Sequence, residues 1–408
     1  MHRLNHLARV AILGAVVVLA ACESKRDVLA PVAPNNDIFR SYVALGNSIT
    51  AGYQSGGIND STQRQSYARL LATSMNTQYH FASLAYPGCN PPIANGLTGA
   101  RLGGFPDTLC AARNPASVND VLNNVAVPGA RVLDPTSLTT VASNGLTTLI
   151  LGGKTQVQKA LEAKPTFASI WIGNNDVLNA GLSGIIVQGT PYSPGIVSTQ
   201  AQFQAAYDLM IKQLTDSAPG LKGVLIGVVQ VSGVPSLTLG SIIAGSPALQ
   251  GAINAGTGKT VVINPNCTGS AALVNLPQII LAIKAGTHPA TIACVANSIP
   301  NTVVGDLFVL DPTEQATLSA AITAYNTYIQ GVATAKGFAY YDPNPLFAAQ
   351  RAAGAIPAAP NFASSTATFG PLFSLDAVHP SAAGQLLIAN DLITVINAKY
   401  GTSLPAAH

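Results

Sequence analysis

Short runs of consecutive apolar residues recur along the chain. Tyr42–Leu45 and Phe167–Ile172 each end at a glycine, and Val224–Val231 and Phe338–Tyr341 have the same apolar character. Predominantly apolar runs of this length are typical of strands that are buried on both faces of a sheet. Asn124–Val127 could add a fifth strand.

Segments with helical spacing separate several of these runs. Asp311, Pro312 and Glu314 supply an N-cap, a first-turn proline and a glutamate that can close a capping box. The apolar residues that follow at helical spacing are Leu318, Ile322, Tyr325, Ile329 and Val332. A last amphipathic helix is predicted over Ser381–Tyr400. Strands that alternate with helices predict an α/β fold with a parallel sheet covered on both faces.

The strand–helix rhythm is lost over residues 235–304, a stretch rich in glycine, alanine and serine. We interpret this stretch as a large insertion. It could be a cap near an active site or a surface excursion without a role in the site. Residues 352–368 are biased towards alanine, proline and serine, which predicts a loop.

The N-terminus has the pattern of an export signal. Arg3 and Arg9 precede the apolar run Val10–Ala20, which is too short to span a bilayer comfortably. Leu19–Cys22 resembles a bacterial lipobox, which implies a signal peptide over residues 1–21 and a lipid on Cys22. Residues 22–39 would then be the lipidated N-terminus and a tether that holds the protein at a membrane of the cell envelope, and residues 40–400 the folded domain. An ordinary cleaved signal that happens to contain a cysteine is the alternative.

Composition excludes one class of partner. Charged residues make up 9% of the 408 residues, and the formal net charge is +3. A nucleic-acid-binding protein needs a basic footprint, so we expect no nucleic-acid partner.

Four cysteines follow Cys22: Cys89, Cys110, Cys267 and Cys294. An even number in an exported chain favours disulfides, and sequence proximity suggests the pairs Cys89–Cys110 and Cys267–Cys294. Free buried cysteines are the alternative. A zinc site is disfavoured because the spacings contain no Cys-x-x-Cys pair.

A serine, a histidine and an aspartate have the pattern of a nucleophilic site. Ser48 follows the first predicted strand, at the end where open α/β sheets bind ligands. His379 has Asp376 three residues before it, in a segment flanked by proline and glycine. A serine hydroxyl needs a neighbouring base, and the base needs a group that fixes its tautomer. These residue types can therefore supply nucleophile, base and orienting carboxylate.

These blocks resemble the SGNH, or GDSL-like, hydrolase superfamily. Ser48 lies in Gly-Asn-Ser-Ile, Asn175 in Gly-Asn-Asn-Asp, and Asp376 and His379 form the final Asp-x-x-His. The resemblance implies a flavodoxin-like three-layer α/β/α sandwich and a catalytic triad of Ser48, His379 and Asp376. The chain departs from the family at Asn47, where aspartate is usual.

The family also uses a backbone N–H of a glycine in its oxyanion hole. Gly129 fits that block best, and Gly88 is the rival. The N–H groups of Ser48 and Gly129 and the side-chain amide of Asn175 would then stabilise the oxyanion.

The sequence therefore predicts an exported, lipid-anchored serine esterase or lipase that cleaves carboxylic esters without a metal or cofactor. Its substrate would be a small-molecule or lipid ester. The alternatives are a carbohydrate O-acetyl esterase and a non-catalytic binding lipoprotein that retains the fold.

Overall fold

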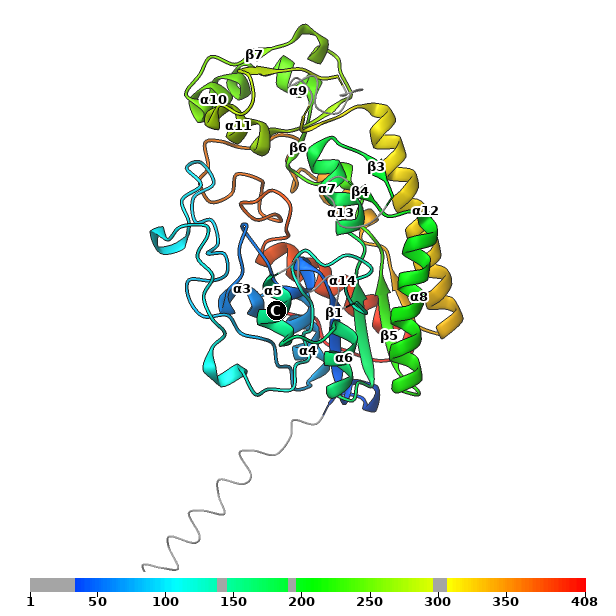
Figure 1. Ribbon diagram of the computed structural model, residues 1–408. Helices are drawn as coiled ribbons and strands as arrows, with labels where there is room; N and C mark the ends of the chain where they lie inside the picture. Colours follow the sequence, from blue (N-terminus) through cyan, green and yellow to red (C-terminus); the bar gives the residue numbers. More distant parts are fainter. Residues whose placement is uncertain (1–33, 138–144, 190–195, 296–306) are drawn as a thin grey trace, which may run out of the picture.

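The computed structural model describes residues 34–137, 145–189, 196–295 and 307–408 (Figure 1). Cys22 and the expected signal peptide lie outside the described residues. Within the described ranges, none of the helices combines the length and apolar character needed to cross a membrane.

A parallel sheet in the order β1-β2-β5-β11 forms the centre of the protein. Its strands are β1 (Tyr42–Gly46), β2 (Phe167–Trp171), β5 (Lys222–Ile226) and β11 (Ala339–Tyr341). β1 and β2 are buried along their whole length, as their predominantly apolar runs predict. The third run is a shorter strand than predicted, because the chain leaves the sheet after Ile226.

The expected fifth strand forms only an isolated bridge. Asn124 pairs with Ala44 on the free edge of β1, where the N–H of Val125 donates to the Ala44 carbonyl over 3.0 Å. The segment thus lies between β1 and β2 in sequence but on the outer side of β1 in space. This order is that of a flavodoxin-like sheet.

Helices cover both faces of the sheet, so the fold is a three-layer α/β/α sandwich. Alternate residues of β1 point to opposite faces: Val43 and Leu45 belong to one apolar core, and Tyr42 and Ala44 to the other. The first core includes α5 (Gly145–Leu151), α6 (Gln156–Glu162), α7 (Asn175–Ser183), α8 (Gln200–Ser217) and α12 (Pro312–Lys336). The second includes η2 (Asp37–Phe39), α4 (Tyr67–Met75), α13 (Asn344–Ala352) and α14 (Ala382–Tyr400).

The two helices with the clearest start signals are confirmed. Asp311 caps α12, and Glu314 closes the capping box. Ser381 caps α14. The remaining short elements are α2 (Ser48–Ala51), α3 (Asp60–Arg64), η3 (Leu102–Gly104), η4 (Pro115–Ser117), β3 (Val187–Gln188), β4 (Ile196–Val197) and η6 (Val231–Gly233).

The folded part extends beyond the expected boundaries of 40–400 at both ends. Phe39 is fully buried, and the N–H of Asn35 donates to the Met75 carbonyl over 3.0 Å. At the other end Leu404 and Ala407 are buried against α14. Residues 35–39, which were expected to belong to a tether, are therefore part of the fold.

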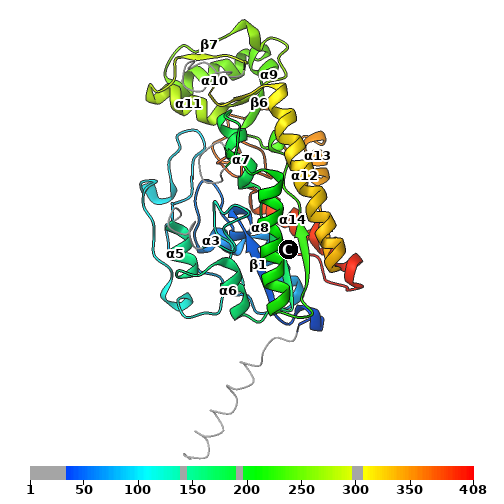
Figure 2. The same cartoon turned by 45° about the vertical axis from the view of Figure 1, so that its right-hand side comes forward.

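Much of the expected insertion forms a lobe at the end of the molecule towards which the strands run (Figures 1 and 2). Its elements are β6 (Leu237–Leu239), α9 (Gly240–Gly245), α10 (Pro247–Thr257), β7 (Val262–Ile263), η7 (Pro265–Cys267), β8 (Leu273–Asn275), α11 (Leu276–Ala285), β9 (Thr291–Ile292) and β10 (Val309–Leu310). It has its own apolar core, which contains a Cys267–Cys294 disulfide. A second disulfide joins Cys89 and Cys110, so both predicted pairings are confirmed.

Candidate active site

Ser48 occupies a tight turn at the carboxyl end of β1. The strand ends at Gly46, Asn47 caps the following helix, and Ser48 is the first residue of α2. The Asn47 Oδ1 accepts the N–H of Ile49 over 3.2 Å. A Cβ at Gly46 would lie 2.4 Å from the Thr50 hydroxyl, so the turn requires glycine. A residue at the start of a helix has no intrahelical partner for its N–H, so the Ser48 N–H is available to a ligand.

Two buried glutamines hold this turn from opposite sides. The Gln156 side chain on α6 accepts the Gly46 N–H over 2.9 Å and donates to the Gly46 carbonyl over 3.0 Å. The Gln385 side chain on α14 donates to the Ile49 carbonyl over 3.1 Å and accepts the Tyr67 N–H over 2.9 Å. Sequence reasoning missed both, although each is a polar residue on an otherwise apolar helix face.

Asp376 and His379 come to Ser48 on the loop between α13 and α14. The His379 Nε2 lies 2.8 Å from the Ser48 Oγ, and the His379 Nδ1 lies 2.8 Å from the Asp376 Oδ2. Only 14% of the histidine side chain and 12% of the aspartate side chain are exposed. The three side chains thus form one continuous hydrogen-bonded chain, largely shielded from water.

Asp376 accepts several hydrogen bonds besides that from the imidazole. Its Oδ1 accepts the N–H groups of Val378 and His379, and its Oδ2 accepts the Gly56 N–H over 2.6 Å. Burial alone would raise the pKa of this carboxyl. The charge of His379 and the hydrogen bonds from His379 and Val378 outweigh burial and lower the pKa to about 2. The carboxylate therefore stays charged and can hold the imidazole Nδ1–H.

Tyr53 packs against the His379 ring. Its ring centroid lies 4.9 Å from that of His379, with the two ring planes inclined by 56°. Burial, together with the charge of Asp376, raises the pKa of Tyr53 to about 12, although Arg101 opposes the shift. The phenol is therefore neutral, and it fixes one face of the imidazole. Sequence reasoning missed this residue, because the two aromatic rings lie far apart in the chain.

Asn175 begins α7 and faces the segment that contains Gly129. Its Nδ2 donates to the Ala130 carbonyl over 2.9 Å. The same segment reaches the Ser48 turn, where the Val127 N–H donates to the Gly46 carbonyl over 3.2 Å. Gly129 itself is exposed to solvent. In the chain, Gly129 thus lies between Val127, which contacts the Ser48 turn, and Ala130, which contacts Asn175.

The rival glycine has different neighbours. Gly88 is buried, and the adjacent Cys89 N–H donates to the Ile58 carbonyl over 2.9 Å. A Cβ at Gly88 would lie 2.5 Å from that same carbonyl oxygen. These contacts place Gly88 against the Ile58 segment. The segment of Gly129 instead contacts the Ser48 turn and Asn175.

Asp176 ties the Gly129 segment to α7. It is fully buried, its Oδ2 accepts the Val132 N–H over 2.9 Å, and its Oδ1 accepts the Ser198 hydroxyl over 2.6 Å. Burial raises the pKa of Asp176 to about 6, although both hydrogen bonds oppose the shift.

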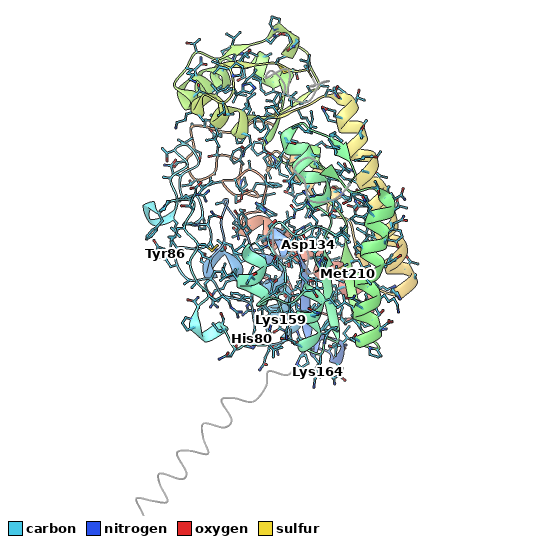
Figure 3. All side chains as sticks on the ribbon, in the orientation of Figure 1. His80, Tyr86, Asp134, Lys159, Lys164 and Met210 are labelled. Atoms are coloured by element: carbon cyan, nitrogen blue, oxygen red, sulfur yellow. A yellow bond between two sulfur atoms is a disulfide. The ribbon has the colours of Figure 1, made fainter. Side chains whose placement is uncertain are left out.

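The other described histidines, His80, His288 and the exposed His408 beyond α14, lie elsewhere. His80 faces Asp120 at 3.5 Å and lies in the lower half of the molecule, away from the lobe (Figure 3). His288 is buried in the loop after α11, with its Nδ1 2.8 Å from the Pro289 carbonyl oxygen. Among the described residues, no group of three or more His, Cys, Asp or Glu side chains could hold a metal ion.

The sequence matches a family model over most of its length. The model, described as GDSL-like Lipase/Acylhydrolase, covers residues 42–392. The chain belongs to this family. Its members cleave ester bonds, so the protein is an ester hydrolase. No curated protein matches the chain significantly.

Two solved structures align with most of the GDSL-like chain. An acetylxylan esterase from Geobacillus stearothermophilus, solved as a catalytic mutant, is 12% identical, with a TM-score of 0.37, and the alignment covers 90% of this chain and 96% of that one. An extracellular lipase from Streptomyces rimosus is 15% identical, with a TM-score of 0.34 and coverage of 88% and 98%.

Proposed function

We propose that this GDSL-like hydrolase is a serine esterase that forms an acyl-enzyme on Ser48. The observation that carries the proposal is the hydrogen-bonded chain from Ser48 through His379 to Asp376. The Nε2 of His379 takes the proton of Ser48 as the Oγ attacks the ester carbonyl. The same proton then goes to the departing alcohol. Water repeats the sequence on the acyl-enzyme and releases the acid and free Ser48.

Three donors would stabilise the negative oxygen of each tetrahedral intermediate. They are the N–H groups of Ser48 and Gly129 and the side-chain amide of Asn175. The contacts of the Gly129 segment with both the Gly46 turn and Asn175 support this set over one that contains Gly88. The first Asn175 proton is engaged by Ala130, which orients the amide, and the second is free to face the substrate.

The test is Ser48→Ala, assayed with p-nitrophenyl acetate and a fluorophosphonate probe. We expect turnover to fall by about 10⁶ and labelling to vanish, because the proposed acyl-enzyme forms on the Ser48 Oγ. Ser217→Ala, at an exposed position at the end of α8, is the matched control and should behave as the parent. A folded Ser48→Ala protein that hydrolyses the ester at the parental rate would refute the mechanism.

We also propose that the protein is exported and anchored in the cell envelope by a lipid on Cys22. The support is the charged and apolar pattern before Leu19–Cys22, together with two disulfides, which persist in oxidising compartments. Cys22→Ser should leave an unprocessed or soluble product, measured by fractionation and mass spectrometry of the N-terminus. Processed Cys22→Ser protein that still sediments with membranes would place the anchor elsewhere.

A further inference from the structure

A small apolar pocket is lined by residues that directly adjoin the proposed nucleophile and base in the chain. Its walls include Ile49, which follows Ser48, and Val378 and Pro380, which flank His379. Nine of its ten lining residues are apolar, so it suits a hydrocarbon group. The pocket therefore shares its walls with the backbone that carries both nucleophile and base.

The single polar lining residue belongs to the block that contains Asn175. Asn174 is 8% exposed, and its Oδ1 accepts the Val229 N–H over 3.0 Å. Val229 also lines the pocket, so this hydrogen bond fixes the wall built by the chain that leaves β5. The pocket is thus held by the same segments that position the catalytic groups.

The volume of the pocket limits what it can hold. The cavity measures about 40 Å³. A buried water needs about 10–15 Å³ on a comparable measure, so about three to four atoms of that size fit. An acetyl, propionyl or butyryl chain fits within this volume, and an octanoyl chain does not.

Two buried phenylalanines restrict the pocket. Phe347 on α13 is 7% exposed, Phe373 before the Asp-x-x-His segment is 6% exposed, and their ring centroids lie 5.7 Å apart. Both line the cavity. Neither ring can turn aside freely, because each is enclosed in the core on the α4 and α14 side of the sheet.

The chemistry of the two steps decides which half of the ester enters this pocket. The acyl group stays bound to Ser48 through both steps, whereas the alcohol must leave before water attacks. A small apolar pocket suits the group that stays. We propose that the pocket binds the acyl chain, and that Phe347 and Phe373 restrict the enzyme to esters of acids with about two to four carbons. This inference rests on the acyl-enzyme mechanism proposed above.

The first experiment varies the acyl chain of p-nitrophenyl esters from two to eight carbons on the parent protein. Each methylene that the pocket accepts should raise kcat/KM about fourfold. We expect a maximum at or below four carbons and a fall of at least about tenfold by eight carbons, because overfilling a packed site is unfavourable. A kcat/KM that continues to rise through eight carbons overturns the proposal.

The second experiment holds the acyl group at butyryl and lengthens the alcohol from ethyl to octyl. The alcohol lies outside the pocket, so kcat/KM should change by less than about threefold across the series. A sharp limit on the alcohol chain, with none on the acyl chain, assigns the pocket to the alcohol and overturns the proposal.

Variants test the role of the two rings. Phe347→Leu and Phe373→Leu should shift the acyl optimum to six or more carbons, because each leaves a cavity that a longer chain fills. Phe369→Leu is the matched control, since Phe369 is 4% exposed in the same core but does not line the pocket. An optimum that shifts equally in the control, or in none of the variants, contradicts the assignment.

A variant that narrows the pocket tests the proposal even if the two leucine variants do not fold. Leu178 is partly exposed and lines the pocket, so Leu178→Phe should narrow it and leave acetyl as the best substrate. An unchanged acyl profile in this variant counts against the proposal. Hydrolysis by Ser48→Ala would instead refute the mechanism, so the two failures are distinguishable.

Discussion

Replacing Asp376 by asparagine keeps the size of the side chain but removes one acceptor and the negative charge. The Asp376 Oδ1 accepts two backbone N–H groups, and its Oδ2 accepts the Gly56 N–H and faces the His379 Nδ1. An amide has one oxygen, so it can satisfy only one of these two sets of donors.

The two backbone donors on the Oδ1 side favour the amide orientation that places the Nδ2 against His379. The imidazole Nδ1 must then accept a hydrogen bond, and the ring proton moves to the Nε2 that faces Ser48. An Nε2–H cannot take the serine proton. We expect kcat to fall by about 10⁴ at neutral pH, the effect of the wrong tautomer in such a triad.

The same substitution has a predictable effect on stability. The pKa of Asp376 is about 2 in the folded protein against an ordinary 3.8. At about 1.36 kcal/mol per pKa unit, the difference corresponds to about 2 kcal/mol of folding free energy. A lowered carboxyl pKa stabilises the folded state. The stabilisation is complete at pH values above the ordinary pKa of 3.8, and it disappears as the pH falls from 3.8 through 2.

Denaturant unfolding of parent and Asp376→Asn at pH 7 and pH 3 measures this contribution. The difference in unfolding free energy should be about 2 kcal/mol at pH 7 and about half of that at pH 3. Asp216→Asn is the control, because the Asp216 side chain is 61% exposed and pairs only with Lys212 on the surface of α8. A difference that is independent of pH, or an Asp376→Asn variant with parental kcat, would refute the reasoning.

Three further changes test other parts of the site and fold. Asn175→Ala should lower turnover by about 10²–10³ and retain labelling by a phosphonate, because it removes an oxyanion donor and not the nucleophile. Cys267→Ser with Cys294→Ser should lower the unfolding free energy by about 3.5 kcal/mol, from the entropy of opening a loop of 27 residues, measured by denaturant unfolding. Asp176 has a raised pKa of about 6, so its buried carboxyl stabilises the fold below 3.8, and this contribution is lost as the pH rises through 6. Relative to the parent, the unfolding free energy of Asp176→Asn should therefore increase by up to about 3 kcal/mol as the pH rises from 4 to 8. An advantage of the same size at both pH values would show that Asp176 does not titrate in this range.

The sequence predicted those helices and strands whose limits depend on neighbouring residues in the chain. The capping box at Asp311 fixes where α12 begins, and the apolar runs of β1 and β2 suffice for strands buried on both faces. The possible fifth strand at Asn124–Val127 lies beside β1 as a parallel strand would, but it forms only the isolated bridge of Asn124 with Ala44.

The candidate site could be predicted only where short blocks carry its chemistry. Asp376 and His379 lie three residues apart, so the sequence alone indicates their pairing. Tyr53, Gln156 and Gln385 act through contacts with distant residues, and nothing in their immediate sequence indicates those contacts. The volume beside Ser48 is a property of packing between elements, which no single segment encodes.

A backbone hydrogen bond connects the base of the lobe to the segment of the proposed catalytic carboxylate. Ala377, between Asp376 and His379, is fully buried and has a φ of +64°, a left-handed conformation that costs a non-glycine residue about 1–2 kcal/mol. The N–H of Ser236, at the base of the lobe, donates to the Ala377 carbonyl over 3.1 Å. The lobe thus helps to hold the backbone in the conformation that turns Asp376 back towards His379. Displacing the base of the lobe would therefore release Ala377 and disturb the triad, although the lobe supplies none of its three side chains.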